Sequence, residues 1–246
     1  MIKDNHLYNE SCLETMKKMP DGFINLIITS PPYNMNLRLS KGKYISRELV
    51  KEFSTKYDGF NDNLPIEEFY DFHKKALEEM LRVSGLIFYV IQIVTGSKIP
   101  FFKMIGDFHD KLKEIIVWDK CHGIPSMQHQ VLNRRSELIL VFENSHPKYR
   151  QFKEAPFARG TLDDIWQIKR ESKRSRSSYH GAAFPEELVE KVLTNFSNEG
   201  DRVYDPFLGT GTTALVARKM NRKYVGSELL PNYLEIAENR LNASLF

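Results

Sequence analysis

The segment from Leu26 to Asn36 reads LIITSPPYNMN, so a buried apolar run meets a serine, two prolines and a tyrosine. A strand that ends in an ordinary turn would explain this pattern. The residue types also suit one chemistry, because the amino groups of adenine and cytosine are poor nucleophiles until hydrogen-bond acceptors hold them. Ser30 and a carbonyl in the rigid Pro31–Pro32 stretch can supply those acceptors. Tyr33 can stack on a base outside the duplex, a contact worth about 1–3 kcal/mol.

A second stretch with chemical potential, VYDPFLGTGTT, lies far downstream. Gly209 and Gly211 stand between a predicted strand and a predicted helix, where glycine permits a tight turn. The helix opens at Thr212, and its free N–H groups favour an anion. Because the loop lacks a third dinucleotide-type glycine and a Walker lysine, it suits a small carboxylate better than a phosphate. Glu228 ends the next predicted strand, where an acid can accept both ribose hydroxyls of a nucleoside. A plain turn followed by a surface acid is the alternative.

The elements that must position these residues alternate along the chain. The sequence predicts strands at 23–29, 85–92, 112–120, 136–144 and 223–229, and a strand, tight loop and helix over 202–220. Further helices are predicted at 65–83, 184–197 and 231–243. This alternation predicts an α/β, doubly wound, mostly parallel sheet, which binds ligands at the carboxyl ends of its strands. Residues 35–63 are predicted to form a mobile loop near the active site with a short helix at 46–54, within a single domain spanning 1–246.

The composition narrows the class of protein. The chain has 246 residues, of which 41% are hydrophobic and 27% charged, and its net charge of +3 is only weak support for a nucleic-acid partner. Cys12 and Cys121 stand apart without metal-site spacing, so we expect no metal, no disulfide framework and a reducing cytosol. The polar start of the chain does not resemble a signal peptide, and its longest apolar run is too short to cross a membrane.

Together these motifs resemble those of the β-class S-adenosylmethionine-dependent DNA amino-methyltransferases of restriction-modification systems. TSPPYN is similar to their motif IV, and DPFLGTGTT with the following VGSEL is similar to their motifs I and II. AAFPEEL, at 182–188, resembles motif X, and RVSGLIFYVI resembles motifs V and VI. In this chain motif IV comes before motifs X and I, which is the circularly permuted order of the β class. The resemblance therefore implies a Rossmann-like methyltransferase fold. Protein-glutamine methyltransferases, which also carry a PPY motif, place motif I first.

The resemblance assigns roles to individual residues. It implies that Ser30, Pro31, Pro32 and Tyr33 serve the target base in catalysis. It implies a cofactor site formed by Phe184, Pro185, Asp205, Phe207, Gly209, Gly211, Thr212 and Glu228. Relatives often carry GDCLE near the N-terminus, whereas this chain has ESCLE, so Ser11 or Cys12 would contact the cofactor adenine through side chain or backbone. The implied cofactor is S-adenosylmethionine, which leaves as S-adenosylhomocysteine.

The implied function is methyl transfer to the exocyclic amino group of a flipped base in duplex DNA. In the family, SPPY accompanies cytosine N4 methylation and DPPY accompanies adenine N6 methylation. A serine hydroxyl can accept from the amino group and donate to cytosine N3, although adenine N1 is also an acceptor. Cytosine N4 is therefore favoured, and adenine N6 is the alternative. An RNA or small-molecule methyltransferase and an inactive DNA-binding module are less favoured.

The expected partner is double-stranded DNA, and the resemblance also implies a functional pairing with a restriction endonuclease. Target recognition is expected in a small insertion at 145–180, where the basic residues Lys169, Arg170, Lys173, Arg174 and Arg176 would meet phosphates. A solvated charged loop is the plainer interpretation of that run. We expect a cytoplasmic protein that joins the nucleoid through DNA and contacts no membrane, and a homodimer is left open.

Overall fold

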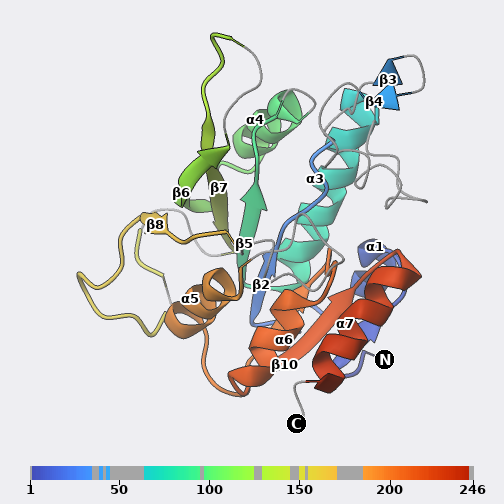
Figure 1. Ribbon diagram of the computed structural model, residues 1–246. Helices are drawn as coiled ribbons and strands as arrows, with labels where there is room; N and C mark the ends of the chain where they lie inside the picture. The colour runs from blue at the N-terminus through green and yellow to red at the C-terminus, as the bar shows by residue number, and fades with distance from the viewer. Residues whose placement is uncertain are drawn as a thin grey trace.

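The computed structural model describes residues 2–34, 39–40, 43–44, 64–94, 97–124, 129–144, 150–152, 155–170 and 185–243. A central sheet runs through the molecule with helices on both sides (Figure 1). The predicted mobile loop at 35–63 and its short helix lie outside the described residues. The exceptions are the short strands β3 (Leu39–Ser40) and β4 (Lys43–Tyr44), which pair antiparallel.

The central sheet confirms the predicted α/β class. Its strand order is β1-β10-β9-β2-β5-β7-β6-β8. All neighbours are parallel except β7, which runs antiparallel to both β5 and β6. The strands are β1 (His6–Tyr8), β2 (Leu26–Thr29), β5 (Leu86–Ile91), β6 (Leu112–Ile124), β7 (Arg134–Glu143), β8 (Ile165–Gln167), β9 (Arg202–Asp205) and β10 (Lys223–Ser227).

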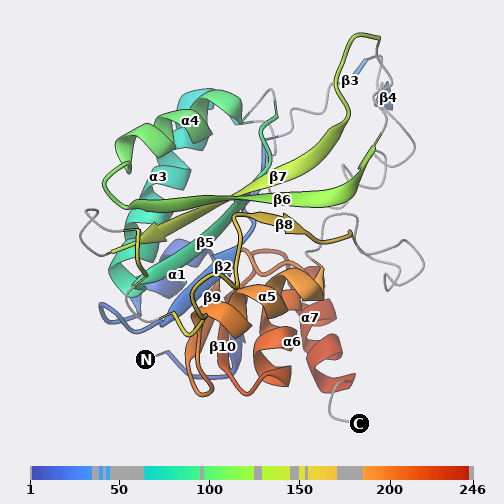
Figure 2. The same ribbon diagram turned by 90° about the vertical axis from the view of Figure 1, so that its left-hand side faces the viewer.

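The helices form two layers, one on each face of the sheet (Figure 2). One layer contains α1 (Cys12–Lys17), α3 (Ile66–Val83) and α4 (Lys98–Asp107). The other contains α5 (Glu186–Phe196), α6 (Thr212–Lys219) and α7 (Pro231–Ala243). Both α3 and α5 begin directly after a proline and carry two glutamates in the first turn, which favours a helix N-terminus. Within the described residues, no helix is long and apolar enough to cross a membrane.

Alternation along the strands fills the two cores. Ile27 of β2 and Tyr204 of β9 point into the core beneath α1, α3 and α4. Leu26, Ile28 and Val203 point into the opposite core beneath α5 and α6. Because successive strand residues face opposite sides, a strand buried on both faces must be apolar throughout. This burial explains why FINLIIT shows no polar alternation.

Strand β8 was not predicted, because it lies in a segment without apolar periodicity. Its one deeply buried residue, Trp166, is fully covered in the core beside α5, and its indole N–H donates to the Asp163 carbonyl at 2.8 Å. Part of the expected 145–180 insertion is therefore built into the edge of the sheet. Strand β6 also continues beyond its predicted end, so the β6–β7 hairpin projects past the carboxyl end of β5 (Figure 2).

Candidate active site

The two sequence motifs meet at the carboxyl ends of neighbouring parallel strands. Ser30 follows β2, and the loop that starts at Asp205 follows the adjacent β9. Glu228 follows β10, which pairs with β9, and its backbone N–H donates to the Tyr8 carbonyl of β1 at 3.0 Å. Residues far apart in the chain thus share one edge of the sheet, as expected for ligand sites in such folds.

Asp205 joins motif IV to the glycine loop. Its carboxylate accepts hydrogen bonds from the Thr29 hydroxyl at 2.6 Å, the Thr213 hydroxyl at 2.7 Å and the Phe207 N–H at 3.1 Å. The residue is only 2% exposed, and burial raises its pKa to about 6 although these three donors lower it. Asp205 therefore holds together the end of β2, the loop and the start of α6.

Glycine conformations shape the loop between β9 and α6. Gly209 and Gly211 have φ of +54° and +80°, which disfavour any residue with a Cβ. At Gly211 a Cβ would also lie 2.7 Å from the Cβ of Ala237 on α7. The Arg240 guanidinium, also on α7, donates to the Thr210 carbonyl at 2.7 Å and to the Thr212 hydroxyl at 3.1 Å. Sequence reasoning missed Arg240, because nothing local links a C-terminal arginine to this loop.

Glu228 faces the same loop from β10. Its carboxylate accepts from the Gly209 N–H at 2.8 Å and from the Leu230 N–H at 2.9 Å. Burial raises the pKa of Glu228 to about 7, against the effect of these N–H groups. Each carboxylate oxygen keeps a further lone pair, so the group can still accept two hydroxyl donors from a ribose.

Motif IV forms a turn with a fixed hydrogen-bond pattern. The hydroxyls of Ser30 and Tyr33 lie 2.5 Å apart, and Pro31 between them is buried. Asn34, in the left-handed region with φ of +50°, forms a pair of hydrogen bonds with the Leu64 backbone at 2.8 and 3.0 Å. The chain before and after the loop at 35–63 is therefore joined beside the candidate base site.

Two residues of the β6–β7 hairpin approach this turn. The Tyr33 hydroxyl donates to Glu137 Oε2 at 3.4 Å, and Lys120 Nζ donates to Glu137 Oε1 at 2.8 Å. The Lys120 side chain is fully buried, and burial lowers its pKa more than Glu137 raises it. Arg170 and Arg134 lower it further, so both guanidinium groups act on this site. The sequence signal was a lysine that follows Asp119 at the end of the apolar run IIVW.

Other predicted site residues are placed less directly. Cys12 is buried in the core beneath α1, α3 and α4, and this burial raises the pKa of its thiol to about 12. Any cofactor contact there would therefore come from the backbone or from Ser11. Phe207 packs against Phe72 with ring centroids 6.0 Å apart. Pro185 is the N-cap of α5, while Phe184 lies outside the described residues.

The predicted DNA-binding residues are only partly placed. Lys169 is exposed and Arg170 is half-buried, just after β8. Because β8 pairs parallel with the part of β6 that leads to Lys120, both lie at the same edge as the candidate site. Lys173, Arg174 and Arg176 lie outside the described residues. Groups of acidic residues, histidines and cysteines suited to a metal ion do not occur in the part of the chain that the structure describes.

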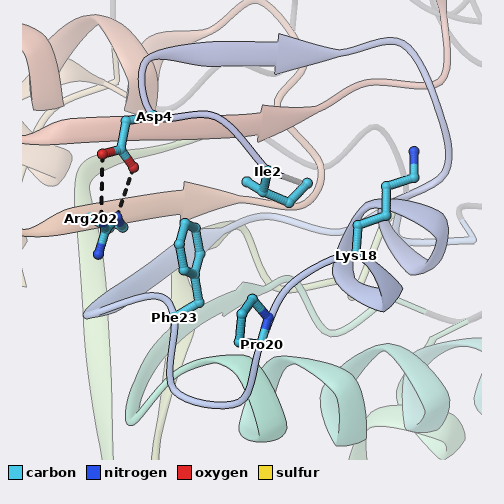
Figure 3. Close-up of a pocket in the computed structure, with 6 residues that line it drawn as sticks. All are labelled: Ile2, Asp4, Lys18, Pro20, Phe23 and Arg202. Carbon is cyan, nitrogen blue, oxygen red and sulfur yellow. Dashed lines mark hydrogen bonds and ion pairs between the residues drawn. The ribbon is translucent and has the colours of Figure 1, made fainter.

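A hollow of about 380 Å³ lies at the opposite, amino edge of the sheet. It is lined by Ile2, Asp4, Lys18, Pro20, Phe23 and Arg202 (Figure 3). Its charged side chains are paired, since Arg202 bonds Asp4 at 2.7 Å and Lys18 bonds Glu10 at 2.5 Å. The hollow contains none of the motif residues, so the candidate site is the carboxyl edge.

A Rossmann-like sheet that carries a glycine loop, Glu228 and an SPPY turn at one edge is the arrangement expected of an amino-methyltransferase. The family model described as DNA methylase, which covers the N6 and N4 enzymes, matches residues 24–239. The chain therefore belongs to this family of DNA amino-methyltransferases of restriction-modification type.

Individual relatives agree with this assignment. The chain is 27% identical to the type II methyltransferase M.BglII of Bacillus subtilis over 95% of this chain and 68% of that protein. Its fold matches the cytosine-N4-specific PvuII DNA methyltransferase with a TM-score of 0.71 and 19% identity, covering 98% of this chain and 87% of that one. It also matches M1.HpyAVI in its complex with SAM, with a TM-score of 0.64 and 19% identity, covering 96% and 98% of the two chains.

Proposed function

We propose that this protein transfers a methyl group from S-adenosylmethionine to the exocyclic amino group of a flipped base in duplex DNA. The observation that carries the proposal is the hydrogen bond between Thr29 and Asp205, which ties the base-binding turn to the cofactor loop. A methyl donor in the loop and a base on the turn would then lie side by side. Such placement is the main requirement for a direct transfer between two bound molecules.

The cofactor side of the site fits S-adenosylmethionine. The first N–H groups of α6 have no partner within the helix and favour the carboxylate of the methionine moiety. Glu228 would accept the ribose hydroxyls, and Phe207 lies beside the loop. When bound, the cofactor supplies a methyl group on a positively charged sulfur. The complex of M1.HpyAVI with SAM supports this choice.

The base side of the site would prepare the amino group for attack. Ser30 Oγ and a carbonyl of the Pro31–Pro32 stretch accept the two amino hydrogens, so the nitrogen lone pair leaves the plane of the ring. That lone pair would then be placed to form a bond to the methyl carbon that the bound cofactor supplies, with the sulfur leaving and keeping the electrons of the carbon–sulfur bond. One amino proton then leaves to solvent, and Tyr33 holds the base by stacking.

The choice of base stays a proposal, with cytosine N4 favoured and adenine N6 as the alternative. The serine of the SPPY motif and the cytosine-N4-specific PvuII enzyme support cytosine. The physical chemistry of the turn discriminates weakly, since both bases carry an amino group beside a ring nitrogen. Sequencing of DNA from cells that express the protein, by a method that separates N4-methylcytosine from N6-methyladenine, decides between them.

Basic side chains support duplex DNA as the partner. Lys169 and Arg170 lie at the edge that carries the turn, and Arg134 begins the neighbouring strand β7. They would contact phosphates and position the duplex without reading its sequence. Lys173, Arg174 and Arg176 would extend this contact. A cognate restriction endonuclease and a cytoplasmic location complete the proposal, and a homodimer is left open.

Transfer of a tritiated methyl group to DNA tests the function. The wild-type protein should label mixed-sequence duplex DNA, and excess duplex should compete for the label better than excess RNA. Ser30→Ala should lower kcat by about 100-fold while the Kd for the cofactor stays unchanged. No incorporation by the folded protein would refute the activity, and an unchanged kcat in Ser30→Ala would refute the assignment of the base site.

A further inference from the structure

Four side chains form a continuous chain of contacts from the core of the hairpin to the catalytic turn. Lys120 Nζ donates to Glu137 Oε1 at 2.8 Å, and the Tyr33 hydroxyl meets Glu137 Oε2 at 3.4 Å. The same Tyr33 hydroxyl lies 2.5 Å from Ser30 Oγ. The lysine side chain is 0% exposed and that of Glu137 is 13% exposed. The buried Lys120–Glu137 ion pair is thus connected through Tyr33 to Ser30, the proposed acceptor for the target base.

The Glu137 carboxylate favours one direction for these hydrogen bonds. A carboxylate can only accept, so in the 3.4 Å contact with Glu137 the Tyr33 hydroxyl is the donor. Tyr33 then has only a lone pair to offer to Ser30. Either hydroxyl can donate in the 2.5 Å contact; with the Tyr33 proton given to Glu137, the Ser30 hydroxyl would be the donor and its lone pairs would be left for a ligand.

We propose that the Lys120–Glu137 pair is a positioning pair that sets this direction and so makes Ser30 an acceptor for the amino group of the target base. The inference rests on the proposed function and deepens it. Lys120 is the buried counter-ion of the carboxylate and holds it against β6, facing Tyr33. A neutral amide at position 137 could donate to Tyr33, which would then donate to Ser30 and reverse the chain.

The inference changes how Ser30 compares with an aspartate. With its proton engaged by Tyr33, Ser30 does not donate to cytosine N3 while it accepts from the amino group. It offers the base lone pairs only, as the aspartate of a DPPY motif would. The hydrogen bonding of the serine therefore gives no preference between cytosine and adenine. The support for cytosine is then the pattern of the family alone, and the rest of the pocket must make the choice.

The Glu137→Gln variant tests the direction of the chain. It should lower kcat by about 10- to 100-fold with an unchanged Kd for the cofactor, because Tyr33 would then occupy one of the two Ser30 lone pairs and the freed Ser30 proton would face the amino group. Tyr33→Phe should lower kcat as well. Since Glu137 acts through Tyr33, adding Glu137→Gln to Tyr33→Phe should change kcat by less than about twofold.

The chain offers a matched control at the other end of β7. Lys113 and Glu143 form a second buried pair at 2.7 Å, with side chains 5% and 9% exposed, at the amino edge of the sheet. Glu143→Gln should lower stability and leave kcat unchanged. If Glu137→Gln fails to fold, Lys120→Met with Glu137→Met removes both charges in an apolar replacement that buried pairs often tolerate. That double variant should also lose kcat.

The outcomes separate the inference from the proposed function. A folded wild-type protein that methylates no DNA would overturn both. An active wild-type protein in which the effects of Glu137→Gln and Tyr33→Phe multiply would overturn the inference alone. An equal loss of kcat in Glu143→Gln would do the same, since it would show that the Glu137 effect is one of packing.

Discussion

The Thr29 hydroxyl donates a 2.6 Å hydrogen bond to the Asp205 carboxylate across 176 residues of sequence. Thr29 is the last residue of β2 and Asp205 the last of β9, so the bond sets the spacing of the two motifs that follow these strands. The donor and acceptor are both buried, which makes the loss of either one costly.

Replacement of Thr29 tests this link through its pH dependence. Thr29→Val keeps the shape and removes the donor, so we expect a loss of about 1–3 kcal/mol in the free energy of unfolding. The folded-state pKa of Asp205, about 6, lies above its unfolded value, so stability already falls as pH rises from about 4 to 6. Removing a donor raises this pKa further, and the loss should be greater at pH 8 than at pH 5. Urea unfolding at both pH values measures it.

Thr29→Ser is the control, because it keeps the hydroxyl and loses only a methyl group. It should show no greater loss at pH 8 than at pH 5. A loss in Thr29→Val that is equal at both pH values would contradict the coupling to Asp205.

Glu228 predicts a pH dependence of cofactor binding. Its pKa is raised to about 7. The ionised carboxylate can accept from both ribose hydroxyls, whereas in the protonated form one oxygen carries a proton and acts as a donor. The affinity for S-adenosylmethionine should therefore rise by up to about tenfold from pH 6 to pH 8. Glu228→Gln should bind more weakly and lose this part of the pH dependence. Calorimetric titration at pH 6, 7 and 8 measures both.

Glu199→Gln removes a similar charge from an exposed position at the amino edge and should behave as the wild type. Titration of the cofactor's own amino group affects every variant equally. A pH profile of Glu228→Gln that parallels the wild type would show that this carboxylate does not meet the ribose.

The two loop glycines should differ in their tolerance of alanine. Gly209→Ala has no atom within 4 Å of the new Cβ and meets only the strain of positive φ, about 1 kcal/mol. Gly211→Ala adds contacts of 2.7 and 3.1 Å with Ala237, so it should cost about 2–4 kcal/mol in total. Urea unfolding without cofactor compares them. Equal losses in the free energy of unfolding would mean that α7 does not restrict the space at Gly211.

The basic edge predicts a salt dependence of DNA binding. A plot of the logarithm of the DNA association constant against the logarithm of salt concentration has a negative slope. Lys169→Ala and Arg170→Ala should each make this slope less steep by about 0.9 if each side chain neutralises one phosphate. Lys17→Ala, at an exposed position paired with Glu14 on α1, is the control and should leave the slope unchanged. Fluorescence anisotropy with a labelled duplex at several salt concentrations measures the slope. An unchanged slope in both test variants would place the DNA elsewhere.

The sequence alone determined the class of fold and the two motifs, because their signals are local. Apolar runs such as LIIT predict buried strands wherever they lie, and glycines between strand and helix predict a tight loop. The order of the motifs led to the family before any contact was known. The short strand β8 was not predictable, since a single buried Trp166 gives no period.

Only the tertiary structure decided how the site is held together. The parallel strands β2 and β9 bring Thr29 to Asp205. Helix α7 brings Arg240 to Thr212, and the antiparallel β6–β7 hairpin brings Lys120 and Glu137 to Tyr33. No local pattern encodes such meetings, since each side chain also suits an ordinary surface position. The SPPY turn looked at first like an acceptor site with a serine free to donate as well. Tyr33 lies within hydrogen-bonding distance of Ser30 and of Glu137, and these contacts carry the proposal that the Ser30 proton points to Tyr33.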